Sequence, residues 1–155
     1  MAHDDRAAIE SICRQYGDRP EALIEILHDV QAQSGCVADE AVRLIAERLN
    51  LSRADVHGVR SYYSDFTTEP DGRCVVRLCR AEACKAVGAD MLAEAVETRL
   101  GVKTGETAPD GSVSVKSVFC LGDCALGPAA MIGETLIGRA TPDRIEAKVS
   151  EAVDE

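Results

Sequence analysis

Two pairs of cysteines, Cys79 with Cys84 and Cys120 with Cys124, constrain this chain of 155 residues more than any other feature. A run of β-forming residues precedes each pair, at 74–78 and at 113–119, so each pair is expected directly after a strand. Two strands that end side by side would bring both pairs to one edge of a sheet. Four thiolates at one edge suit a soft metal ion or an iron–sulfur cluster.

The spacing of the cysteines leaves more than one chemistry open. Structural zinc takes four thiolates from close pairs, and a dithiol–disulfide site needs only one close pair. A [2Fe–2S] cluster also takes four thiolates, and a four-residue gap occurs in plant-type ferredoxins. The surrounding residues favour iron–sulfur, because Gly122 and Gly127 let backbone N–H groups approach sulfur closely. Further apolar residues would line the site: Ala81, Ala83, Leu121, Ala125 and Leu126.

Composition indicates a water-soluble protein with an aliphatic core. Apolar residues make up 46% of the chain and charged residues 28%, whereas aromatic residues reach only 3%. No apolar run approaches the roughly 18 residues of a membrane span, and residues 1–6 do not resemble a signal peptide. We therefore expect a cytoplasmic protein without membrane insertion. The net charge of −10 argues against nucleic acid as a partner.

The pattern of apolar residues changes near residue 70, which predicts two domains. Residues 1–70 read as an N-terminal helical domain, in which Leu23, Ile26, Leu27 and Val30 share one helix face. Similar helices are expected at 38–50, with Val42, Ile45, Ala46 and Leu49 inward, and after Ser52, where Ser52 and Asp55 form a capping box.

Residues 71–155 read as a second domain that begins at a turn, 69–72 (sequence EPDG). A strand precedes Cys79, and a helix of about 15 residues after Cys84 ends at Gly101. A second strand, a hairpin of 129–132 with 135–137, and a last helix starting at Thr141 and Pro142 complete the order β-α-β-β-β-α. The predicted fold class is α/β: an N-terminal helical bundle followed by a small domain with a four-stranded sheet, similar to thioredoxin.

The second cysteine pair and its Gly-Pro tail carry a specific resemblance. Residues 79–84 (CRAEAC) and 120–132 (CLGDCALGPAAMI) resemble the thioredoxin-like [2Fe–2S] subunit family of NADH dehydrogenases. The segments 59–66 (VRSYYSDF) and 138–143 (GRATPD) are similar to other parts of that family, so that the resemblance covers nearly the whole chain. It implies a [2Fe–2S] cluster held by Cys79, Cys84, Cys120 and Cys124, with electron transfer rather than catalysis as the role of this subunit.

Within the family, segment 79–84 looks most like the gamma subunit of NAD-dependent formate dehydrogenase. The alternative is the 24 kDa subunit of NADH-quinone oxidoreductase, which is complex I. The resemblance implies a flavoprotein partner with FMN, the NAD(H) site and a [4Fe–4S] cluster, and for formate dehydrogenase a larger molybdenum-containing subunit. The competing interpretation from the residues alone is a zinc-stabilised interaction module.

The remaining candidate residues have structural interpretations. Cys13, Cys36 and Cys74 lie outside the pairs and are expected in the core, and Cys74 should face away from Cys79 on the same strand. Tyr62, Tyr63 and Phe66 are expected to pack between the helical part and the sheet. Three cations, at Arg80, Lys85 and Arg139, are candidates for contact with a flavoprotein. Asp123 would lower the reduction potential if it faced a cluster.

Overall fold

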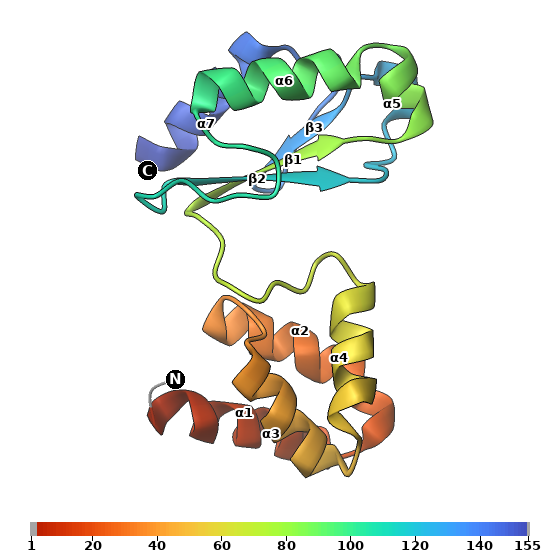
Figure 1. Cartoon of the computed structure of the whole chain (residues 1–155), viewed down its shortest axis with the longest axis vertical. Helices are drawn as coiled ribbons and strands as arrows, with labels where there is room; N and C mark the ends of the chain where they lie inside the picture. Colours follow the sequence, from red (N-terminus) through yellow and green to blue (C-terminus); the bar gives the residue numbers. More distant parts are fainter. Residues whose placement is uncertain (1–2, 155) are drawn as a thin grey trace. The chain divides into compact units, whose positions relative to one another are not determined.

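Helices build the first part of the chain in the computed structural model, which describes residues 3–154 (Figure 1). The chain divides into two compact units, Met1–Pro70 and Asp71–Glu155. The first unit holds α1 (His3–Gln15), a 3₁₀ helix η1 (Pro20–Ala22), α2 (Leu23–Ser34), α3 (Asp39–Leu49) and α4 (Arg53–Tyr62). None of the helices within residues 3–154 is long and apolar enough to cross a membrane.

Sequence patterns correctly predicted how these helices start, stop and face inward. The four apolar residues predicted to share one face of α2 are all buried, as are the four predicted for α3. The side chain of Ser52 accepts from the backbone N–H of Asp55, whose carboxylate accepts from the N–H of Ser52, which confirms the capping box of α4. The core of this unit is almost entirely aliphatic and includes Ile9, Ile26, Leu27, Leu44, Ile45 and Leu49.

The three aromatic residues after Val59 do not all pack as predicted. Phe66 is 8% exposed and lies in the core of the helical unit. Tyr62 is 81% exposed and Tyr63 is 41% exposed, so the prediction that they pack between the helical part and the sheet is wrong for Tyr62.

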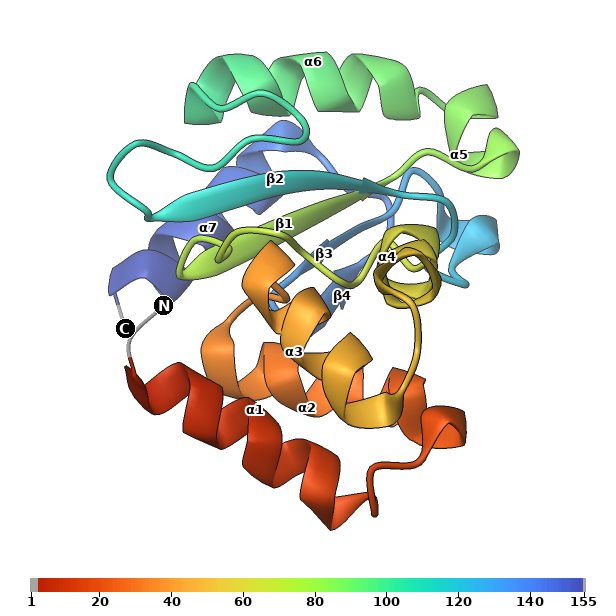
Figure 2. The ribbon, with the colours of Figure 1, turned by 60° about the horizontal axis from the view of Figure 1, so that its bottom comes forward.

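A four-stranded sheet organises the second unit (Figure 2). Its strands are β1 (Cys74–Cys79), β2 (Val113–Val118), β3 (Ala130–Ile132) and β4 (Thr135–Ile137), in the order β2-β1-β3-β4. Strands β1 and β2 are parallel, with Cys79 opposite Val118, so both strands end at the same edge. Strand β3 pairs antiparallel with β1 and forms the predicted hairpin with β4.

Helices α6 (Ala89–Leu100) and α7 (Pro142–Asp154) contribute to one core with the sheet. Leu92 and Val96 of α6 join Ile145 and Val149 of α7 against the buried side chains of the strands. Together with the strand order, this arrangement confirms the α/β fold class with a thioredoxin-like domain.

The helix predicted after Cys84 is instead two helices. The short α5 (Glu82–Ala86) starts before Cys84 and contains it, and α6 follows after a break. Gly88 causes the break, since its φ of +97° is a left-handed conformation that helices do not accommodate and that glycine adopts without steric cost. Val87 and Met91, on either side of this break, are 55% and 73% exposed.

The polar loop after Gly101 returns along the outer edge of β2. The N–H of Ala108 donates to the carbonyl of Val113, and the N–H of Val115 donates to the carbonyl of Glu106. These bonds satisfy part of the β2 edge, so that the strand preceding the second cysteine pair has hydrogen-bond partners on both sides.

Candidate metal centre

The first cysteine pair lies where β1 ends, in a small apolar cluster. Cys79 is the last residue of β1, and its N–H donates to the carbonyl of Ala129 at 3.1 Å. Cys84 lies in α5, and the two cysteines are only 2% and 1% exposed. They pack with Ala89 and Ala129, and the partly buried Ala81, Val118 and Leu121 surround them. Burial raises the pKa of the Cys84 thiol, and the neighbouring Cys79 thiol raises it further.

The second pair lies in the loop after β2, and both of its thiols are exposed. The Sγ atoms of Cys120 and Cys124 are 3.9 Å apart. Between them, Gly122 adopts a φ of +80°, and its backbone N–H donates to the Sγ of Cys120 over 3.3 Å. The predicted role of Gly122 in bringing an N–H to sulfur is therefore confirmed. The hydrogen bond with Cys120 raises the pKa of the Cys124 thiol.

The two pairs meet at one edge of the sheet. Cys79 is the last residue of β1, and Cys120 follows two residues after the end of β2, the parallel strand paired with it. Gly127 passes between them, because a Cβ atom built there would lie 3.5 Å from the Sγ of Cys84 and 3.6 Å from the carbonyl oxygen of Cys124.

The donor set fits a cluster that takes its ligands in pairs. Among residues 3–154, no group of three or more His, Cys, Asp or Glu side chains is arranged around a single metal position. In a [2Fe–2S] cluster each iron takes two protein ligands, so the unit required of the protein is a pair of thiolates. The chain supplies two such pairs, one buried and one exposed.

The other cysteines lie apart from this site. Cys74 is 3% exposed and belongs to the core between the sheet and the helices, whereas Cys79 belongs to the separate apolar cluster described above, as the strand alternation predicted. Cys13 is fully buried in the helical unit, and burial raises its pKa. Cys36 is partly buried rather than a core residue.

The three candidate cations differ in their surroundings. Arg80 forms an ion pair with Asp90 at 2.6 Å, and its Nε is buried with no hydrogen-bond partner within the described residues. Lys85 and Arg139 are exposed. The carboxylate of Asp123 packs against Gly138, where a Cβ atom would lie 2.5 Å from its Oδ2.

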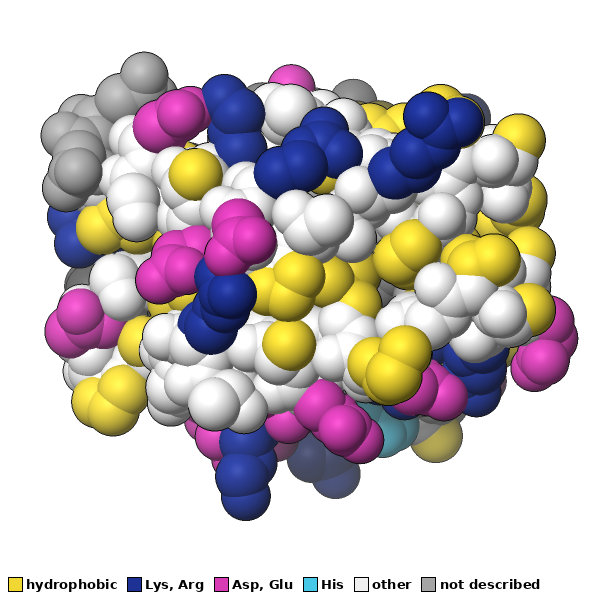
Figure 3. All heavy atoms as spheres, turned by 90° about the horizontal axis from the view of Figure 1, so that it is seen from above, with side chains coloured by type: hydrophobic (Ala, Val, Ile, Leu, Met, Phe, Trp, Pro, Cys, Tyr) yellow, Lys and Arg dark blue, Asp and Glu magenta, His cyan; other side chains and the backbone are white. Residues whose placement is uncertain are grey.

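The sequence singled out Leu126 as a lining residue of the site but did not single out Phe119. Phe119 directly precedes Cys120 and is 85% exposed, and Leu126 follows Cys124 at 40% exposure. Figure 3 shows exposed hydrophobic side chains among charged ones on one face of the molecule. A large aromatic side chain next to a ligand candidate is the signal by which Phe119 could have been found.

Comparison with known sequences assigns the family. The sequence profile of the family described as "Thioredoxin-like [2Fe-2S] ferredoxin" matches residues 9–152. The chain belongs to that family. The predicted recognition of a thioredoxin-like [2Fe–2S] family is thus confirmed, and a [2Fe–2S] cluster is the cofactor of the family.

Curated relatives of this ferredoxin-family chain cover most of its length. The E subunit of NADH-quinone oxidoreductase from Pseudomonas aeruginosa is 36% identical over 152 residues, which is 98% of this chain and 91% of the relative. The corresponding E subunit from Escherichia coli K12 is 38% identical, over 91% of this chain and 85% of its own. The NADP-reducing hydrogenase subunit HndA of Solidesulfovibrio fructosivorans is 33% identical, over 92% of this chain and 81% of the relative.

A solved structure shares the fold of this family member. The NAD⁺-reducing [NiFe]-hydrogenase in the air-oxidized state superposes with a TM-score of 0.68 over 84% of this chain, at 21% identity. The chain covers 22% of that hydrogenase chain, and the likeness concerns the fold alone.

Proposed function

We propose that this protein carries single electrons within an NADH-oxidising complex, through a [2Fe–2S] cluster held by Cys79, Cys84, Cys120 and Cys124. The observation that carries the proposal is the meeting of two thiol pairs at one sheet edge, inside the stretch that matches the family. When bound, the cluster supplies a centre that takes up and gives back one electron at a time.

The protein's own residues have three tasks at this site. Cys79, Cys84, Cys120 and Cys124 would hold the cluster. The apolar side chains around the first pair exclude water from that half, which disfavours added negative charge there. The N–H of Gly122 points at Cys120 and favours negative charge on that sulfur. The reduction potential is set by the balance of these opposing effects.

The exposed half of the site supports electron exchange with another protein. Cys120 and Cys124 are exposed, and the apolar side chains of Phe119 and Leu126 lie next to them in the chain. Electron tunnelling falls steeply with distance, so the partner must pack against this half. The sequence has no G-x-G-x-x-G segment after a strand, which suits a partner that holds FMN, the NAD(H) site and a [4Fe–4S] cluster. A partner using NAD(H) also fits the cytoplasmic location expected from the sequence.

The relatives favour NADH-quinone oxidoreductase as the complex. Two of them are E subunits of that enzyme and match over most of both chains. Formate dehydrogenase, with its molybdenum-containing subunit, is the second candidate and rests on the resemblance of segment 79–84 to its gamma subunit. The hydrogenase relative shows that the family also occurs in a complex of a third kind.

Reconstitution tests the proposed function. The cluster-loaded chain is mixed with an FMN-containing, NADH-oxidising flavoprotein subunit from the same organism, and NADH is added without oxygen. We expect an EPR signal of a reduced [2Fe–2S] cluster only when both proteins are present, and no NADH or formate oxidation by the chain alone. A flavoprotein that is active with artificial acceptors but neither binds nor reduces this chain contradicts the proposal.

Purification of the native complex decides which enzyme it is. Membrane subunits in stoichiometric amounts support NADH-quinone oxidoreductase. A molybdenum-containing subunit with NAD-dependent formate oxidation supports formate dehydrogenase instead.

A further inference from the structure

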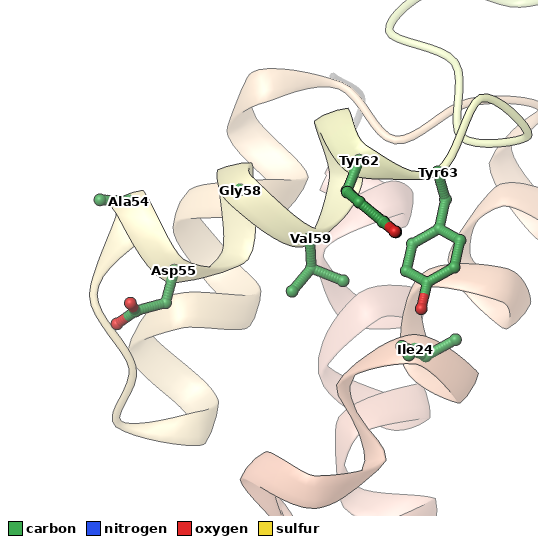
Figure 4. Close-up of a pocket in the computed structure, with 7 residues that line it drawn as sticks. All are labelled: Ile24, Ala54, Asp55, Gly58, Val59, Tyr62 and Tyr63. Atoms are coloured by element: carbon green, nitrogen blue, oxygen red, sulfur yellow. The ribbon is translucent and has the colours of Figure 1, made fainter.

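A groove on the surface of the helical unit lies apart from the cysteine pairs in the sequence. The groove has a volume of about 460 Å³ and lies between residues of α2 and residues at and just after α4. Figure 4 shows the residues that line it. Seven residues line it: Ile24, Ala54, Asp55, Gly58, Val59, Tyr62 and Tyr63. Gly58 leaves open space in the groove, because a Cβ atom at this position would meet nothing within 4 Å.

The groove exposes apolar side chains that the core of the unit does not use. Ile24 is 38% exposed, although its neighbours Leu23 and Ile26 are buried and already provide the inward face of α2. Tyr62 and Tyr63 add two large rings at 81% and 41% exposure. Exposed isoleucine and tyrosine side chains gathered around one hollow are typical of a protein interaction site.

The tyrosine rings are held in place by their neighbours. The ring centroids of Tyr62 and Tyr63 are 5.1 Å apart with an edge-on arrangement, and those of Tyr63 and the buried Phe66 are 5.9 Å apart. In Figure 4 the Tyr63 side chain extends toward Ile24. Because the rings are already ordered, less conformational entropy is lost when a partner binds them.

The groove does not suit a small polar ligand. Asp55 is the one charged residue among the seven that line it, and its carboxylate already accepts from the backbone N–H and the Oγ of Ser52. A small molecule also needs most of its surface to be buried in its site. This groove is too open for that, since one of its lining residues, Tyr62, is itself 81% exposed.

The charge around the groove indicates the character of the occupant. Glu21 and Glu25 lie close to Ile24 in the chain, and both are exposed, as is Arg53 directly before the lining residues Ala54 and Asp55, so that acidic residues outnumber basic ones around the groove. The one arginine in the second half of α4, Arg60, is 4% exposed and turns inward to the carbonyl of Val37. A positively charged partner is therefore electrostatically complementary to this face.

We propose that this groove docks a segment of another subunit whose apolar side chains are flanked by lysine or arginine. The apolar residues of the segment would fill the space between Ile24 and the tyrosines, and its cations would face Glu21 and Glu25. The inference rests on the proposed function in one respect, which is that the chain acts inside a multi-subunit complex.

Photo-cross-linking in the assembled complex tests the proposal. Tyr62 is replaced by p-benzoylphenylalanine, which keeps an aromatic ring at an exposed position, and the cross-linked peptide is sequenced by mass spectrometry. We expect a peptide of another subunit with apolar residues flanked by lysine or arginine. The same photo-reactive residue at the exposed Glu47 of α3 is the control and should not capture that peptide.

A matched pair of charge variants gives a second measurement. Ala54 lies in the groove and is exposed, so Ala54→Lys and Ala54→Glu place similar lengths of side chain there with opposite charge. Ala54→Lys should weaken assembly severalfold at low salt, Ala54→Glu should not, and Tyr62→Ala should weaken it about tenfold. Thermal unfolding of each variant checks that the helical unit stays folded.

Other outcomes overturn the inference. They are a cross-link to an acidic segment, a cross-link to a second copy of this chain, and no cross-link at all in a complex that reduces the cluster with NADH. Loss of NADH-driven reduction in the unsubstituted complex would instead count against the proposed function, so that the two failures are distinguishable.

Discussion

Gly127 passes directly against the buried thiol of Cys84, so that a Cβ atom added to the glycine would lie 3.5 Å from the Sγ of Cys84. The same Cβ atom would lie 2.9 Å from the Cγ2 of Val87, which is closer than nonbonded carbon atoms approach. The chain after the second cysteine pair is thus packed onto Cys84 of the first pair.

Substitution of Gly127 should therefore disturb the metal centre. We expect Gly127→Ala to lower the iron content per chain and to destabilise the second unit by about 1–3 kcal/mol, because Val87 must move. Iron analysis and thermal unfolding check this. The double variant Gly127→Ala with Val87→Ala removes the clash and should recover most of the iron, and failure of this rescue would contradict the packing explanation.

The cysteines of the two pairs should differ sharply from the others. Cys79→Ser, Cys84→Ser, Cys120→Ser or Cys124→Ser should each abolish the cluster or change its EPR spectrum, since oxygen replaces a thiolate ligand. Cys74→Ala, Cys13→Ala and Cys36→Ala should retain the spectrum. A folded Cys74→Ala protein without a cluster would show that the ligands are wrongly assigned.

The sequence predicted the local structure next to the cysteines better than it predicted the helix break and the exposed residues near them. The strand run before Cys79 and the glycine between Cys120 and Cys124 follow local rules, so the sequence indicated both correctly. The break between α5 and α6 was missed because it depends on one residue, Gly88, in a stretch whose composition otherwise favours a helix. Exposure of Phe119 depends on where the whole strand ends, which no local pattern specifies.

The helical unit shows the same contrast. Apolar spacing predicted the inward faces of α2 and α3 because burial there repeats with the helical period. It did not predict that Arg60 is buried, since a cation in an amphipathic helix normally lies on the water-facing side. Only the fold reveals that Val37 and Asp39 meet its guanidinium group.

Loss of the buried Arg60 side chain should destabilise the helical unit more than loss of the charge of its partner Asp39. Its Nη1 donates to the carbonyl of Val37 and pairs with Asp39 at 2.8 Å. Arg60→Ala should cost about 1–3 kcal/mol, because it leaves the Val37 carbonyl without this donor. Asp39→Asn should cost less than about 1 kcal/mol, since the Asp39 side chain is 91% exposed. Denaturant unfolding measures both, and equal costs would contradict this explanation.

Stability at alkaline pH should depend on Tyr16. Its hydroxyl donates to Asp29 over 2.8 Å, and this hydrogen bond raises the pKa of Tyr16. A raised pKa in the folded state contributes stability that is present below the unfolded value of about 10 and is lost as the pH rises through the folded value. Tyr16→Phe should therefore show a smaller loss of stability above pH ~10 than the unsubstituted protein.

Asp29→Asn provides the control for that prediction, because the amide oxygen still accepts from Tyr16 but carries no charge. It should lower the pKa of Tyr16, measured by ultraviolet titration of the phenol. An alkaline stability profile that is the same in all three proteins would rule out a role for this hydrogen bond.

The central claim, that two thiol pairs hold a [2Fe–2S] cluster, is tested most directly by metal and sulfide analysis. The protein is produced under conditions that support cluster assembly, purified without oxygen, and analysed for iron, zinc and acid-labile sulfide. We predict two irons and two sulfides per chain, with visible absorption that disappears in the four cysteine variants. One zinc per chain, with neither sulfide nor visible absorption, would contradict the account and favour a zinc-stabilised interaction module.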